Sequence, residues 1–511
     1  MGGLGEECGI AGVYLKNGID KKAQTPRYLY SMLSKIQHRG QLSAGISVYN
    51  PESKGGRILS VHKAIGKVDD LFDVKDQKEY KKILRYSAGT AGIGHVRYST
   101  SGNGKNHLAL LNEAQPFFRH HGRPWKRFSL AFNGNLANAD ELRKEITESE
   151  KYIFDTEVDT EAIMHLLSIN LKALSTKDGQ GRDMKPDLFD VFGKVAERLD
   201  GACNLVSLFS DGDLVVFRDA FGFKPLVWGE NSDAYAVASE STSLEGIGIN
   251  NFYPVPEGNC MIFNRQGIQD KKISDSLHKS HCHFEWVYFS RAQSVIDNKS
   301  VNSVRENLGK ELAKIEPLKQ GMKQEEYVVV PVPKTAIPAA EEYAHEMGIR
   351  FSLALDKAHG ERGFINKSNE RERIMDKEYG IFKERVKDKK VIVIEDSIVR
   401  GETSKKIIRL LRDAGAKEVH FRSTEPPIVF PCFYGIDFPT YKELIASKYS
   451  DNLEIEIAKE IGADSVVYQT LEGLVNAIGF PKNDLCLACL TGKYPTPGGK
   501  MLAEKITGHA I

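Results

Sequence analysis

The sequence predicts an α+β domain followed by an α/β domain that is built on a parallel sheet. In the first half, short strand-like runs broken by Gly and Asn are separated by longer amphipathic stretches such as residues 161–174. Strands and helices that occur in blocks are typical of α+β domains. In the second half, continuous apolar strands alternate with helices, and this pattern indicates a parallel sheet with both faces covered.

Three strand-like runs of the first half lie at residues 44–49, 91–98 and 205–209. They are followed by a stretch rich in Gly, Asn and Pro at residues 246–256. Residues of these types favour turns and loops. We therefore expect the domain boundary between residues 240 and 270.

Two strand–helix pairs define the expected parallel sheet. Residues 327–333 form an apolar run that ends in proline, and a helix is expected at residues 339–346. Residues 391–394 form the next apolar run, followed by a helix at residues 405–414 with Gly415 as its stop signal. Ligands bind at the carboxyl ends of the strands in such folds.

The composition is that of an ordinary globular chain. Its 511 residues suggest about two to four domains. Lys and Arg number 70 and Asp and Glu number 69, so a net charge of +1 gives no case for binding nucleic acid or an anionic membrane. No apolar run approaches the ~20 residues that span a bilayer, and the N-terminus lacks a secretory signal. We therefore expect a cytoplasmic protein.

Cys8 lies directly before an apolar, strand-like run. If residues 1–7 were removed, Cys8 would carry both a thiol and a free α-amino group, whose pKa is about 8. Nucleophile and general base would then occupy one residue, as in N-terminal Thr and Cys hydrolases. The alternative is that Cys8 is a small buried side chain at the start of a first strand.

Residues 391–404 combine a buried strand, two adjacent carboxylates and a short loop that leads into a helix. Glu395 and Asp396 end the strand, and Ser397 and Gly401 lie in the loop. The N–H groups of the loop and the helix N-terminus suit a phosphate, whereas the carboxylates suit sugar hydroxyls or Mg²⁺. The alternative is a strand–turn–helix with an acidic cap.

This segment resembles the phosphoribosyl-pyrophosphate (PRPP) binding motif of phosphoribosyltransferases, and in particular that of the glutamine amidophosphoribosyltransferase family. The resemblance extends from Cys8 to about Pro497. Other stretches resemble the family in the same order along the chain, at residues 37–41, 94–100, 133–136, 159–161 and 434–437.

The resemblance implies an N-terminal nucleophile (Ntn) glutaminase sandwich at residues 8–245, preceded by a propeptide at residues 1–7. It implies a type I phosphoribosyltransferase domain, an α/β fold with a parallel sheet, at residues 265–480. A C-terminal tail would occupy residues 481–511.

In the glutaminase half, the resemblance implies that Cys8 attacks the side-chain amide of glutamine and releases ammonia. Asn133 and Gly134 would form the oxyanion hole, although on their own these two residues are also a hairpin-turn signal. Arg97 would bind the α-carboxylate of the substrate and Asp159 its α-amino group; on their own, both are ordinary surface charges. The residues implied to bind glutamine are Arg97, Thr100 and Asp159.

In the second half, the resemblance implies that ammonia arrives internally and displaces pyrophosphate from PRPP. The product would be phosphoribosylamine, in the first step of purine nucleotide synthesis. The implied magnesium ligands are Thr335, Glu395 and Asp396. The implied PRPP-binding residues are Glu395, Asp396, Ser397, Ile398, Val399, Arg400, Gly401, Glu402 and Thr403.

Seven cysteines are too few for a disulfide scaffold, and clustered cysteines in a reducing compartment indicate metal binding or catalysis. Cys486 and Cys489 form a C-x-x-C pair, which fits a redox pair, half of a zinc site or part of an iron–sulfur site. Cys282 and Cys432 lie in segments that resemble those with the other two ligands in the iron–sulfur subgroup of the family. The resemblance implies one structural [4Fe–4S] cluster, with zinc on four cysteines as the alternative.

The resemblance is weakest in the segment expected to close over PRPP. Residues 356–365 keep only Arg362, Phe364 and Ile365 of the family pattern. The segment is polar and charged, as expected of a mobile lid. At the strand end, Glu395 replaces the commoner Asp, which preserves the charge.

The sequence leaves three hypotheses for the function. The first is the amidotransferase itself, and the family pattern then implies feedback inhibition by purine nucleotides and a homotetramer or dimer. The second is a regulatory or nucleotide-binding paralogue, in which the altered lid at residues 356–363 abolishes transfer. The third is a free-standing glutaminase with a decayed second domain.

Overall fold

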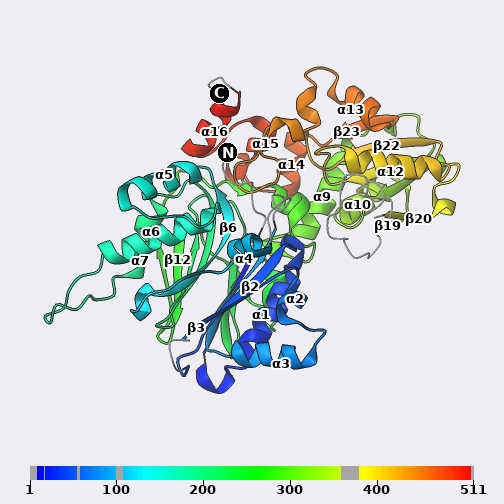
Figure 1. The fold of residues 1–511 in the computed structure, drawn as a ribbon. Helices are drawn as coiled ribbons and strands as arrows, with labels where there is room; N and C mark the ends of the chain where they lie inside the picture. The colour runs from blue at the N-terminus through cyan, green and yellow to red at the C-terminus, as the bar shows by residue number, and fades with distance from the viewer. Residues whose placement is uncertain (1–7, 17, 54–57, 99–106, 358–378, 508–511) are drawn as a thin grey trace.

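The computed structural model describes residues 8–16, 18–53, 58–98, 107–357 and 379–507. Two antiparallel sheets lie in the N-terminal part of the molecule, and a parallel sheet lies in the C-terminal part (Figure 1). The predicted order, an α+β domain followed by an α/β domain, is confirmed by this arrangement.

The first sheet of the N-terminal part has seven strands, with β1 at its centre between β10 and β4. Its strands follow the order β11 (Phe252–Pro254), β9 (Val227–Glu230), β10 (Ala234–Ala238), β1 (Gly9–Leu15), β4 (Ala91–Arg97), β2 (Ser43–Tyr49) and β3 (Leu59–Ile65).

The second sheet has six strands and packs against the first. Apolar side chains of both sheets, such as Ile10 and Ile93 from the first and Val206 and Met261 from the second, share one core cluster. Its strands follow the order β13 (Gly267–Lys272), β12 (Asn259–Asn264), β8 (Leu214–Arg218), β7 (Gly201–Phe209), β6 (Phe128–Leu136) and β5 (Phe117–Arg119).

Helices cover the outer face of each sheet, so the N-terminal part is a four-layer αββα sandwich (Figure 1). The first sheet is covered by α1 (Gln24–Lys35), α2 (Val68–Phe72) and α8 (Ser241–Glu245). The second sheet is covered by α5 (Ala139–Glu150), α6 (Asp159–Ala173) and α7 (Leu188–Ala196).

The sandwich extends beyond residue 245, at which we expected the first domain to end. Strand β11 completes the first sheet, and β12 and β13 complete the second as far as Lys272. The stretch at residues 246–256 therefore lies within the sandwich, where it contributes β11, and does not separate domains. Its Gly and Pro residues allow turns inside a domain as readily as between domains, and for this reason the expected end at residue 245 is too early.

The parallel sheet of the C-terminal part has both faces covered, as its continuous apolar strands predict. Its order is β18 (Arg350–Phe351), β17 (Tyr327–Pro331), β21 (Lys390–Glu395), β22 (Glu418–Ser423) and β23 (Ser465–Tyr468), and every pairing is parallel. One face is covered by α9 (Val301–Lys314) and α10 (Ile337–Met347). The other is covered by α12 (Glu402–Asp413) and α13 (Leu453–Ile461).

Helix α12 begins three residues before the expected start at Lys405. The residue that precedes it, Gly401, has a φ of +78°. Glycine adopts this left-handed conformation without steric cost. The chain can therefore turn directly from the loop after β21 into the helix, which puts the helix N-terminus next to the loop that the sequence singled out.

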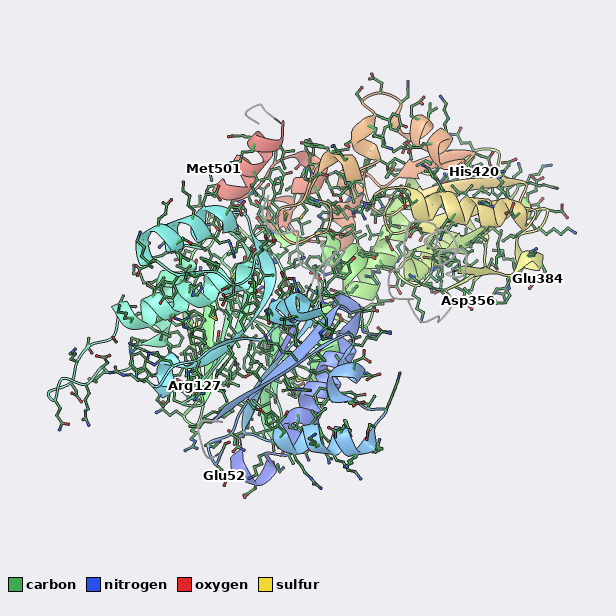
Figure 2. All side chains as sticks on the ribbon, viewed as in Figure 1. Glu52, Arg127, Asp356, Glu384, His420 and Met501 are labelled. Carbon is green, nitrogen blue, oxygen red and sulfur yellow. The ribbon has the colours of Figure 1, made fainter. Side chains whose placement is uncertain are left out.

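The C-terminal segment lies against both parts of the molecule. Strand β24 (Leu485–Cys486) pairs in parallel with β14 (His281–Cys282). Helix α16 (Pro497–Thr507) contacts the sandwich, where the Gly498 N–H donates to Asp200 Oδ2 at 2.8 Å. In Figure 2, Met501 of α16 lies on the side of the sandwich. Asp356, in β19 (Leu355–Lys357), lies on the side of the parallel sheet. Among the described helices, none combines the length and apolarity needed to cross a membrane.

Candidate functional site

Cys8 is fully buried, immediately before β1. Strands β1 and β4 are antiparallel and pair Gly9 with Val96. One position further in the same register, Cys8 stands opposite Arg97. The structure thus brings the expected nucleophile and the expected carboxylate-binding residue to one end of the sheet. The expected propeptide, residues 1–7, lies outside the described residues.

Asn133 and Gly134 lie within β6, where they pair with Asn204 and Cys203 of β7. The hairpin-turn alternative is therefore wrong, because pairing along the whole strand overrides the local turn preference of the two residues. A Cβ atom at position 134 would lie 1.9 Å from the Ala202 carbonyl oxygen. Glycine is required there by this close approach of two strands.

Ser239 joins Asn133 to the strand that follows Cys8. Its hydroxyl oxygen accepts hydrogen bonds from the Ile10 N–H at 3.0 Å and from Asn133 Nδ2 at 3.3 Å. Ile10 lies two residues after Cys8, so Ser239 ties the Asn133 side chain of the second sheet to the strand that begins directly after Cys8. Sequence reasoning missed Ser239, because nothing in its neighbourhood in the sequence marks it.

The backbone of Phe132, the residue before Asn133, is held at both its N–H and its carbonyl. The Phe132 N–H donates to Gln115 Oε1 at 2.7 Å, and the Phe132 carbonyl accepts from His95 Nε2 at 3.1 Å. Burial and the nearby Arg97 guanidinium lower the pKa of His95 to about 3. The imidazole is therefore neutral at physiological pH, and His95 acts as a hydrogen-bond donor that holds the backbone of β6.

Arg97 and Asp159 each have a defined polar neighbour. Arg97 Nη1 lies 3.0 Å from Glu113 Oε2, and both side chains are buried. Asp159 is the first residue of α6, and its Oδ2 accepts the Leu136 N–H at 2.8 Å at the end of β6. Arg97 and Asp159 are both buried, so the alternative that they are ordinary surface charges is wrong. Thr100, the third residue expected to bind glutamine, lies outside the described residues.

The expected PRPP loop leaves the carboxyl end of β21 and is fixed by backbone hydrogen bonds. The Thr424 N–H donates to the Glu395 carbonyl at 2.9 Å, and the Ile445 N–H donates to the Val399 carbonyl at 2.8 Å. Arg400 Nη2 donates to Glu443 Oε1 at 3.0 Å. The remaining residues of the expected set lie on this loop or in the first turn of α12: Ser397, Ile398, Gly401, Glu402 and Thr403.

Thr335 lies in the turn that follows β17, the neighbour of β21. The Val332 N–H donates to the Ile394 carbonyl at 2.8 Å, so the turn starts at the strand end that carries the acids. The two strand ends therefore meet at one edge of the sheet, as expected for a parallel pair.

Glu395 and Asp396 are both buried, and the Oε2 atom of Glu395 has no hydrogen-bond partner among the described residues. Burial and the charge of Asp396 raise the pKa of Glu395 well above its ordinary value. Burial also raises the pKa of Asp396 to about 6, although Ser397 and Arg305 oppose the shift. Two adjacent buried carboxylates that resist ionisation are the donor set that a hard divalent cation would complete.

Four cysteines lie together at the junction of the two parts. The pairing of β14 with β24 aligns Cys282 with Cys486, and the Tyr434 N–H donates to Cys432 Sγ at 3.4 Å. Burial raises the pKa of the Cys282 thiol to about 12, and Cys432 adds to the shift. Burial raises the pKa of the Cys489 thiol, and the charges of neighbouring groups that include Cys432 and Cys486 raise it further. The thiols therefore lie close enough to affect one another's ionisation.

The described cysteines do not form a closely spaced set of three. In the described part of the chain, no three of the cysteines bring their sulfur atoms within 4.8 Å of one another. Cys489 lies in the short helix α15 (Ala488–Thr491), which follows the two-residue strand β24. This context differs from the βαβ unit that is typical of a redox C-x-x-C pair.

Comparisons with known proteins agree with this architecture. Residues 106–246 match the family described as "Glutamine amidotransferase domain", and residues 302–423 match "Phosphoribosyl transferase domain". The amidophosphoribosyltransferase of Methanothermobacter thermautotrophicus is 38% identical over 96% of this chain and 95% of its own length. The amidophosphoribosyltransferase of Bacillus subtilis is 37% identical over 97% of this chain and 95% of its own length.

Solved structures show the same relationship. One is glutamine PRPP amidotransferase from B. subtilis, complexed with ADP and GMP, with a TM-score of 0.79, 35% identity, and coverage of 96% of this chain and 97% of that chain. Another, described as the allosteric regulatory enzyme of purine biosynthesis, has a TM-score of 0.81, 36% identity and 96% coverage of both chains.

The matches exclude one of the three hypotheses. An intact five-stranded parallel sheet and a phosphoribosyltransferase match at residues 302–423 contradict a decayed second domain. The hypothesis of a regulatory paralogue depends on the lid, of which residues 358–363 lie outside the described residues. The predicted glutaminase sandwich, phosphoribosyltransferase domain and glutamine-dependent phosphoribosyl transfer are confirmed, and the chain belongs to the amidophosphoribosyltransferase family.

Proposed function

We propose that Cys8 hydrolyses glutamine and that the ammonia reacts with PRPP at the edge of the parallel sheet. The observation that best supports the first step is the contact of Asn133 with Ser239 beside β1. Attack of the Cys8 thiolate on the amide carbon gives a tetrahedral intermediate, whose oxyanion is stabilised by the Asn133 side chain and the Gly134 N–H. Its collapse releases ammonia and leaves a thioester, which water converts to glutamate.

The general base of this reaction is the α-amino group of Cys8, freed by removal of residues 1–7. Such an amine has a pKa of about 8 and accepts a proton near neutral pH. His95 does not compete for this role, because its pKa of about 3 and its hydrogen bond to the Phe132 carbonyl keep it neutral and occupied as a donor.

Glutamine is recognised by the two charged residues at its α-carbon. Arg97, oriented by Glu113, binds the α-carboxylate through its planar guanidinium. Asp159, held at the end of β6, accepts the α-amino group. Thr100 belongs to the same set.

PRPP binds to the loop after β21. Its phosphate faces the backbone N–H groups of residues 397–403 and the N-terminus of α12. Glu395, Asp396 and Thr335 would hold Mg²⁺, since the unpartnered Glu395 Oε2 atom and the raised pKa values of both acids suit a cation. The ion would neutralise negative charge on the departing pyrophosphate.

The four cysteines would hold one [4Fe–4S] cluster with a structural role. The segments that carry Cys282, Cys432, Cys486 and Cys489 resemble those of the iron–sulfur subgroup of the family, and this resemblance favours a cluster over a single zinc ion. About four irons per chain with visible absorption are expected; zinc without colour would overturn the assignment.

Purine nucleotides would act as feedback ligands, because the related B. subtilis structure is complexed with ADP and GMP. A dimer or tetramer of this chain belongs to the same proposal. We also propose that residues 1–7 are a propeptide and that residues 481–511 are a C-terminal tail with two cluster ligands.

One assay tests the proposed function. Anaerobically prepared protein should consume PRPP only when glutamine or ammonia is present, and it should form phosphoribosylamine with either nitrogen source. Glutamate release that is independent of PRPP, without phosphoribosylamine, would indicate a glutaminase. Nucleotide binding without any turnover would indicate the regulatory paralogue.

A further inference from the structure

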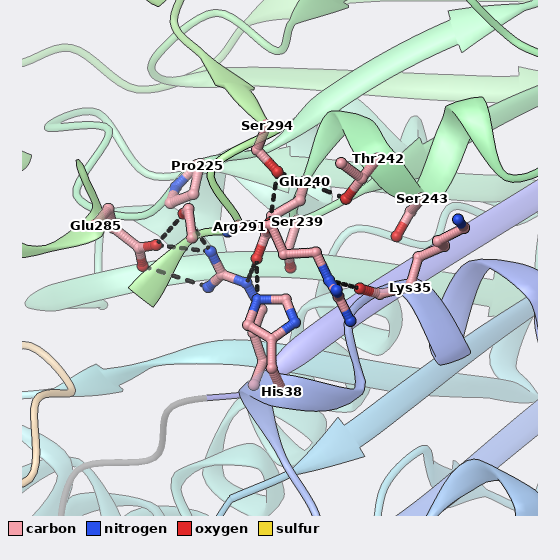
Figure 3. A network of polar contacts seen from close by, with 12 residues as sticks. Lys35, His38, Pro225, Ser239, Glu240, Thr242, Ser243, Glu285, Arg291 and Ser294 are labelled. Atoms are coloured by element: carbon pink, nitrogen blue, oxygen red, sulfur yellow. Dashed lines mark hydrogen bonds and ion pairs between the residues drawn. The ribbon is translucent and has the colours of Figure 1, made fainter. Parts of the chain in front are cut away.

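Polar side chains from both parts of the molecule meet around Glu240, which is fully buried (Figure 3). Its Oε1 atom accepts hydrogen bonds from His38 Nε2 at 2.8 Å and from Arg39 Nε at 2.5 Å. Its Oε2 atom accepts from the Arg291 N–H at 3.0 Å and from the Ser294 hydroxyl at 2.6 Å. Four donors from two separate segments of the chain, residues 38–39 and 291–294, thus surround one carboxylate.

Arg39 extends this junction to the segment that leads into α9. Its Nη2 atom donates to Glu285 Oε2 at 2.6 Å and to Ser290 Oγ at 2.9 Å, while its Nε atom binds Glu240. Only 3% of the Arg39 side chain is exposed. One guanidinium therefore joins a carboxylate of the sandwich to a carboxylate at the start of the second part.

Ser239 connects Glu240 to the glutaminase chemistry. Its hydroxyl oxygen receives Asn133 Nδ2 and the Ile10 N–H, and its own N–H donates to the Ile10 carbonyl at 3.0 Å. Ser239 and Glu240 are consecutive, so the donors that fix the carboxylate also fix the backbone that places the Ser239 hydroxyl. The position of the Asn133 amide depends on that hydroxyl.

The Glu240 carboxylate is ionised in this setting. Burial alone would raise its pKa, but Arg39, His38 and Ser294 outweigh burial and hold the pKa below the ordinary value. Its hydrogen bonds are charge-assisted, and bonds of this type are roughly twice as strong as neutral ones. Loss of the charge would also leave Arg39 with Glu285 as its remaining carboxylate partner in the junction.

We propose that Glu240 is a positioning residue for glutamine hydrolysis: it fixes Ser239, and through Ser239 it places Asn133 where the oxyanion develops. This inference rests on the proposed function of Asn133. The oxyanion forms only in the transition state, so a displaced Asn133 lowers kcat for glutamine and leaves KM for glutamine nearly unchanged.

The test compares glutamine-dependent with ammonia-dependent turnover in the Glu240→Gln variant, which keeps the shape of the side chain. We expect kcat for glutamine hydrolysis to fall by about tenfold to a hundredfold. The ammonia-dependent rate, which does not use Asn133, stays at the wild-type value. Ser294→Ala removes one of the four donors and keeps the charge, and it should give a smaller fall in the same kcat.

The control is Glu316→Gln, which breaks a different buried ion pair. Glu316 accepts two hydrogen bonds from Arg422, at 2.6 and 2.9 Å, inside the second domain and away from Ser239. This variant should lose stability without any change in the ratio of the two activities. A merely structural role of Glu240 would produce the same result in both variants.

An unchanged kcat for glutamine in Glu240→Gln and Ser294→Ala would overturn the inference, and so would an equal fall in Glu316→Gln. If Glu240→Gln does not fold, Ser294→Ala decides alone. Failure of the proposed transfer reaction is distinguishable, because wild-type protein would then form no phosphoribosylamine from ammonia. Glutamate release would still report kcat at the glutaminase site in that case.

Discussion

Two buried glutamates, one in each part of the molecule, show how hydrogen-bond partners determine what a carboxylate can do. Glu240 at the junction receives four donors, and its pKa lies below the ordinary value despite burial. Glu395 at the edge of the parallel sheet has an oxygen without a partner among the described residues, and its pKa is raised. The first glutamate has its partners within the protein, whereas the second keeps an oxygen that the proposed Mg²⁺ would bind.

The largest expected effect is on catalysis at the second glutamate. Glu395→Gln removes a carboxylate that would hold Mg²⁺, so we expect both glutamine-dependent and ammonia-dependent formation of phosphoribosylamine to fall by about a thousandfold. Glu418→Gln, at the start of the neighbouring strand β22, is the control and should keep both rates. A Glu395→Gln enzyme that retains the ammonia-dependent rate would contradict the proposed role of Glu395 in holding Mg²⁺.

The second prediction concerns stability. Here the larger effect is expected at Glu240, whereas the larger effect on catalysis is expected at Glu395. Glu240→Gln should destabilise the fold by about 3 kcal/mol, because it breaks a buried ion pair. Glu395→Gln should leave stability unchanged or increase it, since it replaces a buried carboxylate that lacks a full set of partners. Urea unfolding of the ligand-free variants measures both values, and greater destabilisation by Glu395→Gln would refute the comparison.

The third prediction is a dependence on pH that belongs to the acid pair. The pKa of Asp396 rises from 3.8 to about 6 on folding, so the folded state binds more protons than the unfolded state between these values. Stability of the ligand-free protein should therefore fall as pH rises through this window, by on the order of 3 kcal/mol.

Magnesium binding gives a second measurement of the raised pKa of Asp396. The cation favours the ionised acids, so its binding should release protons near pH 6 and strengthen as pH rises. Calorimetry in buffers of different ionisation enthalpy measures the proton release. Asp396→Asn should reduce it, and a proton release equal to that of the wild type would remove Asp396 as its source.

The sequence predicted those parts of the molecule whose signals are local. The strand that ends in Glu395 and Asp396, and the loop up to Gly401, are contiguous, so the chemistry of the loop could be read from a few residues. The first domain end was placed too early, because Gly and Pro at residues 246–256 give the same signal inside a sandwich as between domains.

The junction could not be predicted from the sequence for a physical reason. Arg39 lies 201 residues from Glu240 and 246 residues from Glu285. Arg39 stands in the stretch at residues 37–41 that resembles the family, but nothing in the sequence pairs it with either glutamate. Their pairing arises only when the sandwich folds and the segment before α9 packs against it. Asn133 and Gly134 show the converse, because their local turn preference gives way to pairing with β7.

The most direct test of the account is the Cys8→Ser variant, assayed with each nitrogen source. The account predicts that formation of phosphoribosylamine from glutamine falls by at least about a thousandfold, because the nucleophile is lost. Formation from ammonia should stay within about twofold of the wild-type rate, because the PRPP site is unchanged. Loss of both activities in a folded variant would contradict the division of labour between the two domains.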